Sequence, residues 1–467
     1  MPLKTTKSTL AARTKSIPWS TLPKTFQDAV FIARRMDVRY LWIDSLCIVQ
    51  DDEQDWMVES AKMCDIYQGA FLTISALRAE SSSEGILLPR PAVRILRRGD
   101  MASPRVAHAR ETIPHRWFTQ RGADDTFFSP TVASRKNDCP LLSRAWCFQE
   151  RLLSTRIAHF ARAEVVWECR SSAECECGAA PPMPLKEGWV GALMYNGGAT
   201  FEKVRFWNNM VLSTYCDKSL TYDSDLLVAL AGVARRFASP ELGRYLGGLW
   251  ENCLAYSLLW ESEDYLGQRI VHRTGLFPGG APTFTWASKV GPIRWRYNSD
   301  SRTDSATDRF DDCAPPPLLI SILDVKCDLG SADPYGKVVG GYLRVSGVLA
   351  QGHLVKTERG GRLGRVSLGL AFAVMFPDDD ERLELTLDSS EDMELIDGTT
   401  VYCLPVVESC RRGDRTVGGQ YDELVQVGLC LRRTEQDDGN FHRIGVFYSS
   451  VGQKSLAAAE RREVGIV

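Results

Sequence analysis

The stretch RYLWIDSLCIVQDDEQDWMVESAKMCDIYQGAFLTISAL, residues 39–77, is the most regularly patterned part of the 467-residue chain. Its residues from Tyr40 to Ile43 are aromatic or branched on both faces, which predicts a strand that is covered on both sides. Asp44 ends this strand, and ligands of open α/β sheets collect at the carboxyl ends of strands. Asp44 and Ser45 are therefore candidate binding residues, although Asp44 can equally tie down the loop that follows.

A helix is predicted after this loop. Asp51 and Gln54 have the spacing of a capping box, and acids occupy the first turn, where the helix dipole favours negative charge. The predicted helix runs from about Glu53 to Tyr67, and the segment FLTISAL starts a new strand after Gly69. Its polar residues gather on one face, which in most helices is a solvated surface: Asp52, Asp55, Glu59 and Lys62.

The flanking segments extend this pattern. Residues 22–36 read as an amphipathic helix, so the order is helix, strand, helix, strand, which indicates a parallel sheet with helices on its faces. Residues 141–159 are predicted to be mainly helical. Four of their side chains suit a polar pocket, or equally a helix of core aromatics with arginine stems along its surface: Arg144, Trp146, Gln149 and Glu150.

Composition predicts an ordinary globular protein of two or three domains, with 44% hydrophobic and 25% charged residues. The formal net charge of −3 gives no reason to expect nucleic acid, and no apolar run reaches the roughly 20 residues that a membrane span needs. The 14 cysteines are scattered as in a reduced, cytoplasmic protein. Cys169, Cys175 and Cys177 are the weak candidates for a zinc site, because no Cys-x-x-Cys pair is present.

The composition of the successive segments predicts an α+β protein with several domains. Beyond a basic tail and the first α/β domain we expect helical segments with core tryptophans, a polar linker, and then runs of period two that predict an antiparallel β domain. An acidic stretch in that last domain, 378–397, reads as a solvated loop and edge strand. The expected parts are a disordered tail at 1–21, the α/β domain at 22–170 with an irregular insertion at 97–138, a helical region at 171–298, a linker at 299–317 and the β domain at 318–467.

Several blocks resemble the HET domain of fungal heterokaryon-incompatibility proteins. They are YLWIDSLCIVQDD followed by DW, Glu59, Met63, IY and LTISA, then LPKTFQDAV at 22–30, and LLSRAWCFQERLLSTRIAHF with VVWEC at 141–169. The resemblance is strong over 22–170 and weak to about 295. It implies a cytoplasmic role in non-self recognition and cell death. HET domains normally begin with a further strand before the LP block, so the sheet is expected to lack its first strand.

The HET domain is in turn similar to the TIR fold, a flavodoxin-like sheet, and some TIR domains cleave nicotinamide from NAD. This similarity implies Glu59 as the catalytic carboxylate, which would stabilise an oxocarbenium-like state. It also implies Trp42 or Trp56 stacked on the base, with Asp44 and Ser45 at the ribose. The spacing departs from the TIR pattern, because Trp56 and Glu59 are three residues apart while Asp55 and Glu59 have the expected four.

Two other classes of function stay open. Walker, Gly-x-Ser-x-Gly and His-Glu-x-x-His motifs are absent from the sequence, so no strong local signal requires an enzyme. One alternative is a non-enzymatic regulator that binds a protein partner or itself. The other is an accessory or catalytic protein of fungal secondary metabolism. No cofactor is implied other than NAD as a substrate.

Overall fold

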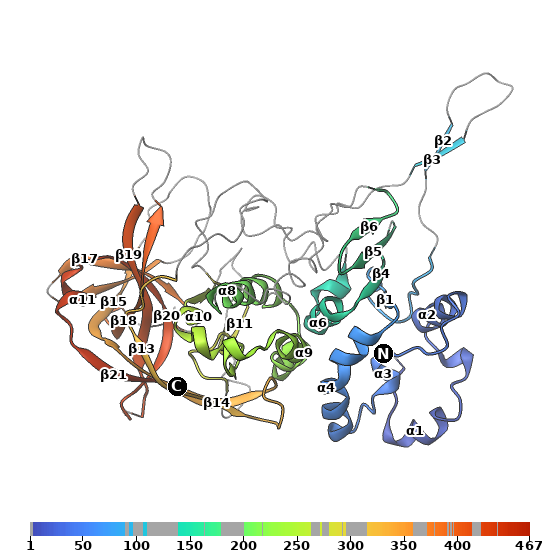
Figure 1. The fold of residues 1–467 in the computed structure, drawn as a ribbon, viewed down its shortest axis with the longest axis horizontal. Coiled ribbons are helices and arrows are strands. Elements are labelled where there is room, and N and C mark those ends of the chain that lie inside the picture. The colour runs from blue at the N-terminus through green and yellow to red at the C-terminus, as the bar shows by residue number, and fades with distance from the viewer. Residues whose placement is uncertain are drawn as a thin grey trace. The chain divides into compact units, whose positions relative to one another are not determined.

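A computed structural model describes residues 3–88, 93–96, 106–109, 139–162, 164–178, 200–216, 218–262, 271–272, 280–291, 293–295, 315–357, 371–377, 379–389, 392, 395, 397–412, 422–436 and 438–467. The chain forms two compact units, each treated separately (Figure 1). The first comprises Met1–Tyr195, Lys218–Leu220 and Ala229–Arg236, and the second the remainder. The expected linker and insertion lie almost entirely outside the described residues.

The helices of the first unit confirm the two that the sequence predicted most clearly. Asp52 begins the long one by accepting hydrogen bonds from the backbone of Gln54 and Asp55, so the cap lies one residue later than the Asp51 spacing suggested. The helices are α1 (Lys7–Arg13), α2 (Lys24–Arg35), α3 (Asp44–Cys47), α4 (Glu53–Gly69) and α6 (Ala145–Leu153), with 3-10 turns at Trp19–Thr21 and Pro140–Ser143.

The sheet of the first unit is mixed, so the expectation of a parallel sheet is only partly right. Its order is β1-β4-β5-β6, and of these pairings only β1 with β4 is parallel. The strands are β1 (Thr73–Ser75), β4 (Arg156–Phe160), β5 (Val165–Cys169) and β6 (Ala173–Cys175), beside a separate hairpin of β2 (Val93–Leu96) and β3 (Val106–Ala109). A hairpin connection brings β5 back antiparallel to β4, because the link between them is too short for a crossover.

The strand predicted at 40–43 is wrong. The segment belongs to no strand, Tyr40 is 84% exposed, and α3 begins directly at Asp44. Apolar residues on both faces indicated burial, but no neighbouring strand pairs with this segment. The first residues, expected to be disordered, instead form α1, and Thr5 is buried where its backbone bridges Val49.

The middle of the chain is only partly helical. It contains α8 (Thr200–Met210), a π-helical turn (Val211–Tyr215), α9 (Val228–Phe237) and α10 (Leu254–Ser257), with 3-10 turns at Asp223–Asp225, Pro240–Leu242, Glu251–Cys253 and Trp286–Ser288. Its short strands are β7 (Tyr245–Leu246), β8 (Leu249–Trp250), β9 (Trp260–Ser262), β10 (Val271–His272), β11 (Lys289–Val290) and β12 (Ile293–Trp295).

The helical region expected at 171–298 is therefore interrupted at residues 245–250. Gly247 and Gly248 have positive φ angles of 59° and 101°, and their tight turn makes a hairpin of β7 and β8. A Cβ on Gly248 would lie 2.4 Å from the ring of Trp286. The four tryptophans of this region are fully buried, which confirms their assignment to the core: Trp207, Trp250, Trp260 and Trp286.

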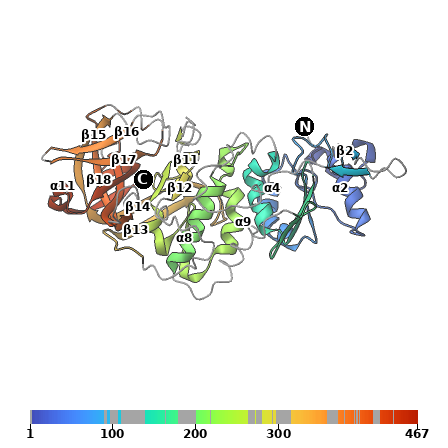
Figure 2. The same cartoon turned by 90° about the horizontal axis from the view of Figure 1, so that it is seen from above.

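The C-terminal strands confirm the predicted antiparallel β domain, drawn from orange to red in Figures 1 and 2. Six strands close into a ring in the order β20-β17-β16-β15-β18-β19, because β19 also pairs with β20. The branch β21-β14-β13 extends from β20, and β20 with β21 is its parallel pairing. The elements are β13 (Ser321–Leu329), β14 (Val338–Val348), β15 (Ala350–Thr357), β16 (Ala371–Phe376), β17 (Asp379–Leu387), β18 (Thr400–Arg412), β19 (Asp422–Arg433), β20 (Asn440–Ser450), α11 (Lys454–Ala458) and β21 (Arg461–Ile466).

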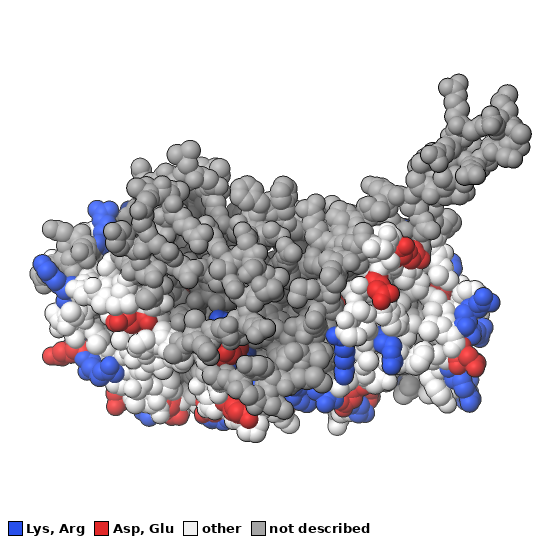
Figure 3. Space-filling view, turned by 45° about the horizontal axis from the view of Figure 1, so that its top comes forward, with Lys and Arg blue, Asp and Glu red and all other residues white. Residues whose placement is uncertain are grey.

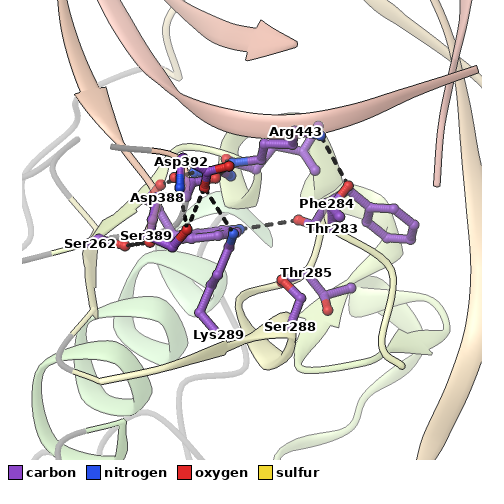
Figure 4. A network of polar contacts seen from close by, with 12 residues as sticks. Ser262, Thr283, Phe284, Thr285, Ser288, Lys289, Asp388, Ser389, Asp392 and Arg443 are labelled. Atoms are coloured by element: carbon purple, nitrogen blue, oxygen red, sulfur yellow. Dashed lines mark hydrogen bonds and ion pairs between the residues drawn. The ribbon is translucent and has the colours of Figure 1, made fainter. Parts of the chain in front are cut away.

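The acidic stretch at 378–397 is neither an edge strand nor wholly solvated. Strand β17 has neighbours on both sides, and the residues after it enter a buried ionic network (Figure 4). Arg443 Nε and Nη2 donate to the two carboxylate oxygens of Asp388 at 2.8 and 3.1 Å. Lys289 Nζ lies 3.5 Å from Asp392 Oδ2, and all four side chains are buried. Their opposite charges compensate each other, which allows them to leave water.

Candidate functional site

A cluster of polar side chains forms where helices α3, α4 and α6 of the first unit meet. Tyr67 of α4 and Cys147, one turn before Glu150 on α6, lie close enough to the Glu150 carboxyl to affect its pKa through their side chains. The charges of Asp44, at the start of α3, and of Arg144, just before α6, both act on Glu150. The cluster therefore joins residues of the neighbouring helices α3 and α4 with residues of α6, which lies far from them in the sequence.

Glu150 is the member of this cluster whose titration differs most from that of a free side chain. Burial raises the pKa of Glu150 to about 7, and the negative charge of Asp44 acts in the same direction. Arg144 and the hydrogen bonds from Cys147 and Tyr67 oppose the rise without cancelling it. A carboxyl group in this range exchanges a proton readily at neutral pH, which is the property required of a general acid or base.

Aromatic side chains surround the cluster. Trp42 meets Tyr67 edge-to-face, with ring centroids 5.7 Å apart and an interplanar angle of 76°. Trp56 of α4 meets Trp146 of α6 in the same manner at 6.1 Å and 86°. These contacts hold α4 against α6 and bring three of the predicted ligand-binding tryptophans, from separate segments, to the same part of the unit.

Glu59 lies near this cluster but has its own partner. Its carboxylate accepts a hydrogen bond from Lys62 Nζ at 2.7 Å, and its side chain is 21% exposed. Partial burial raises the pKa of the Cys47 thiol, and the charges of Asp44 and Glu59 add to the rise. Glu59 and Asp44 therefore both lie within electrostatic reach of Cys47, at the end of α3.

The other predicted residues of this region are anchors of the backbone. Asp55 accepts a hydrogen bond from the Val49 N–H at 2.8 Å and so holds the loop before α4. The Ser45 backbone carbonyl accepts from the Thr5 N–H at 2.8 Å, while its buried hydroxyl has no partner among the described residues.

Sequence reasoning missed Tyr67 and Cys147 as site residues and named Glu150 only as part of a pocket. Tyr67 lies close to the helical face of Trp56 and Met63, which reads as ordinary core packing. Gln149, expected beside Glu150, turns instead to the Gly232 N–H, which donates to it at 2.7 Å. The signal for Glu150 was its place one turn after Trp146, but its raised pKa depends on residues that the sequence does not place nearby.

A cavity of about 320 Å³ lies at the carboxyl ends of β1 and β4, where sheets of this kind commonly hold ligands. Its described lining is apolar apart from Arg78 and Arg162. The two arginines favour an anion. The sequence pattern does not reveal this pocket, because it assigns the strand end to Asp44 and Ser45.

The three cysteines singled out by the sequence do not come together as one group. Cys169 makes sulfur contacts with the hydroxyls of Ser171 and Ser172 at 3.4 and 3.3 Å. Cys175 and Cys177 instead lie close to the carboxylate of Glu164. Within the described part of the chain, no helix is both long and apolar enough to cross a membrane.

Comparison with known proteins finds a family match for part of the first unit. The family described as heterokaryon incompatibility protein (HET) matches residues 3–150, a range that begins before the LP block and ends within α6. No curated protein and no solved structure matches the chain. The matched range contains every member of the polar cluster, from Asp44 to Glu150. Residues 3–150 of this chain therefore form a HET domain of the heterokaryon incompatibility family.

Proposed function

We propose that this HET-domain protein acts in the cytoplasm in heterokaryon incompatibility, where recognition of non-self leads to cell death, and that the HET domain hydrolyses the N-glycosidic bond of NAD. The observation that carries the proposal is the pair of carboxyl groups in unlike surroundings. Glu150 is partly buried and hydrogen-bonded to Tyr67, whereas Asp44 is exposed at the start of α3. Two carboxyl groups in unlike environments commonly divide acid–base and charge-stabilising roles.

The reaction assigns a role to each group. Cleavage of the bond releases nicotinamide as a neutral leaving group and leaves positive charge on the ribosyl carbon. The Asp44 carboxylate stabilises that charge, and Glu150 in its ionised form takes the proton of the attacking water. Tyr67 orients the Glu150 carboxyl through its hydroxyl, while Trp42 and Trp56 offer faces or edges for the base.

Glu59 remains the alternative catalytic carboxylate, because its position after the Ser45 loop is the one that TIR-type domains use. The Lys62 side chain of its ion pair is 58% exposed, so the lysine can give way to a ligand at little cost. The two assignments make different demands on the same domain. Glu59 would act from the second turn of α4, and Glu150 from α6, against Tyr67 near the end of α4.

Nicotinamide release from NAD separates these assignments. The full chain is assayed at high protein concentration as wild type, Glu150→Gln and Glu59→Gln, with folding checked by circular dichroism. Loss of release in Glu150→Gln alone, with a wild-type rate that rises with pH through about 7, supports the cluster. Loss in Glu59→Gln alone assigns the chemistry to the TIR-like position. Absence of release from folded wild-type protein across that pH range contradicts the enzymatic proposal.

Exposed aromatic side chains on and beside α2 favour a second function, partner binding or self-association. Trp19, Phe31 and Tyr40 are 49%, 53% and 84% exposed, on the segment that includes α2. Arg34 lies over the ring of Trp19 at 5.8 Å. In the view of Figure 3, by contrast, described basic and acidic side chains are interspersed. Apolar contact, rather than a field of one charge, is therefore the chemistry this unit offers a partner.

Self-association through these aromatics is tested by light scattering of the full chain. The double variant Phe31→Ser, Tyr40→Ser should remain monomeric at concentrations at which wild type associates. Phe71→Ser removes another exposed aromatic, outside that segment, and should leave association unchanged. Equal association of all three proteins argues against this surface.

A further inference from the structure

We propose that Glu164, Cys175 and Cys177 form a binding site for a thiophilic divalent cation, with Zn²⁺ as its natural occupant. One ligand atom from each residue lies within 4.8 Å of the other two. The sulfur atoms of Cys175 and Cys177 are 3.1 Å apart. All three residues belong to the HET-containing unit, and the site is separate from the Glu150 cluster proposed for catalysis.

The hairpin of β5 and β6 builds this site. Glu164 immediately precedes β5, Cys175 ends β6, and Cys177 lies in the turn that follows. Because Val166 pairs with Cys175 across the hairpin, the chain on either side of that pair places Glu164 next to Cys177. The arrangement is therefore a consequence of strand register, and residues eleven or more apart in sequence reach one point.

Backbone hydrogen bonds hold the ligands in place. The Cys177 N–H donates to Glu164 Oε2 at 3.1 Å, and the Ala161 N–H donates to the Glu164 carbonyl at 3.0 Å. The Gly178 N–H donates to the Cys175 carbonyl at 3.0 Å, and the positive φ of 73° at Gly178 suits glycine in this turn. A site whose ligands are already positioned loses less conformational entropy when a cation binds.

The chemistry of the three ligands selects the cation. Thiolates favour zinc over magnesium and calcium, and a carboxylate oxygen is a common third zinc ligand. Glu164 is only 4% exposed, so its carboxylate faces the interior side of the hairpin turn beside the two thiols. In tetrahedral zinc sites the Zn–S distance of about 2.3 Å separates two sulfurs by roughly 3.8 Å. The observed 3.1 Å therefore requires the thiols to part by a small rotation.

Zinc binding at this site releases two protons and leaves one coordination position of the metal free. Zn²⁺ displaces the thiol protons of Cys175 and Cys177, and these two protons enter solvent. Three protein ligands leave the fourth tetrahedral position to water or to another ligand. Cys177 is exposed, so this position opens toward solvent. The alternative chemistry for two neighbouring thiols is a Cys175–Cys177 disulfide, which excludes zinc.

Zinc content of the full chain tests the site, with Cys169→Ser as the matched control. Protein purified under reducing conditions is loaded with ZnCl₂, dialysed and analysed by elemental mass spectrometry. We expect one zinc per wild-type and Cys169→Ser chain. Cys175→Ser, Cys177→Ser and Glu164→Gln should each lose zinc affinity. Because each change removes a direct ligand, the loss should exceed the roughly 10–100-fold that follows the loss of a residue that only supports a ligand.

Two further measurements keep the test decisive. Circular dichroism without metal shows whether each variant folds, and the thiolate-to-metal charge-transfer band of Co²⁺-loaded protein reports sulfur ligation directly. The band should persist in Cys169→Ser and weaken in Cys177→Ser. The proposal would be overturned if reduced wild-type protein binds no zinc, including protein whose mass before reduction shows a disulfide. Equal losses of zinc in Cys169→Ser and Cys177→Ser would also overturn it.

Discussion

Arg151 donates two hydrogen bonds to Glu168, from Nε at 2.8 Å and from Nη2 at 3.1 Å, and so joins α6 to β5. His159 Nε2 lies 2.9 Å from the same carboxylate. Burial by itself would raise the pKa of Glu168, but the charge of Arg151 and the hydrogen bond with His159 outweigh burial and hold the pKa well below its ordinary value of 4.5. This carboxylate therefore stabilises the fold above about pH 4.5, and the stabilisation is lost as the pH falls below that value.

Glu168→Ala should lower the free energy of unfolding by about 3–5 kcal/mol, because it leaves Arg151 buried without its counter-charge. Glu174→Ala removes an exposed acid from the neighbouring strand and should change stability by less than about 0.5 kcal/mol. Urea denaturation at pH 7 measures both. Similar midpoints for the two variants would show that the Arg151–Glu168 pair contributes little.

Glu150→Gln should change how stability depends on pH. Burial and Asp44 raise the folded-state pKa of Glu150 to about 7, so the folded protein binds a proton more tightly than the unfolded chain. Stability from this group is full below pH 4.5 and is lost as the pH rises toward 7. The melting temperature of wild type should therefore fall more than that of Glu150→Gln between pH 5 and 7.5. Parallel curves would argue against the raised pKa.

Gly232→Ala should destabilise the first unit by about 1–3 kcal/mol. A Cβ there would lie 2.5 Å from Gln149 Oε1 and 3.0 Å from the Cβ of Cys64, both in the packed interior. Gly69→Ala is the matched control, since the space around it is open and alanine favours the helix end. Thermal unfolding of the two variants should diverge in sign, and equal effects would place Gly232 outside the core.

Asp388→Ala should cost the second unit about 3–5 kcal/mol, because Arg443 is fully buried and would lose its carboxylate partner. Arg443 also donates to the backbone carbonyls of Leu258 and Trp260, and these bonds hold the guanidinium in place after the change. Asp328→Ala breaks an exposed pair with Lys326 and should cost about 0–1 kcal/mol. Guanidinium denaturation distinguishes the two variants.

Cys169 should react with iodoacetamide with a midpoint near pH 6. Burial would raise the pKa of its thiol, but hydrogen bonds from Ser171 and Ser172 outweigh burial and lower the pKa to about 6. Ser172→Ala should move the midpoint upward. Peptide mass spectrometry across pH 5–9 follows the alkylation, and a wild-type midpoint close to the ordinary value of 9 would contradict the assignment.

The sequence predicted those parts of the fold whose pattern is local. Helices α2 and α4 and the long C-terminal strands follow from periodicities of 3.6 and two. The strand at 40–43 failed because apolar residues do not show whether a neighbouring strand exists to pair with them. The candidate site could be predicted only in part. Asp44 and Trp42 follow from motifs in the sequence. The pKa of Glu150 and the pairing of Gln149 with Gly232 depend on contacts between distant segments. The neighbour of Cys177 could not be predicted either, because only strand register shows that Glu164, rather than Cys169, lies beside it.

The closed ring of the C-terminal sheet has a consequence for solubility. Among the described strands of that sheet, β13 alone has a single neighbour, so its outer backbone groups could add a strand from another molecule. Leu323 and Leu329 on β13 are 46% and 42% exposed and would favour such growth into aggregates. Asp324, Lys326 and Asp328 alternate with them, and their charges oppose the stacking of like chains. These three charged residues therefore disfavour fibril growth at the β13 edge of the described sheet.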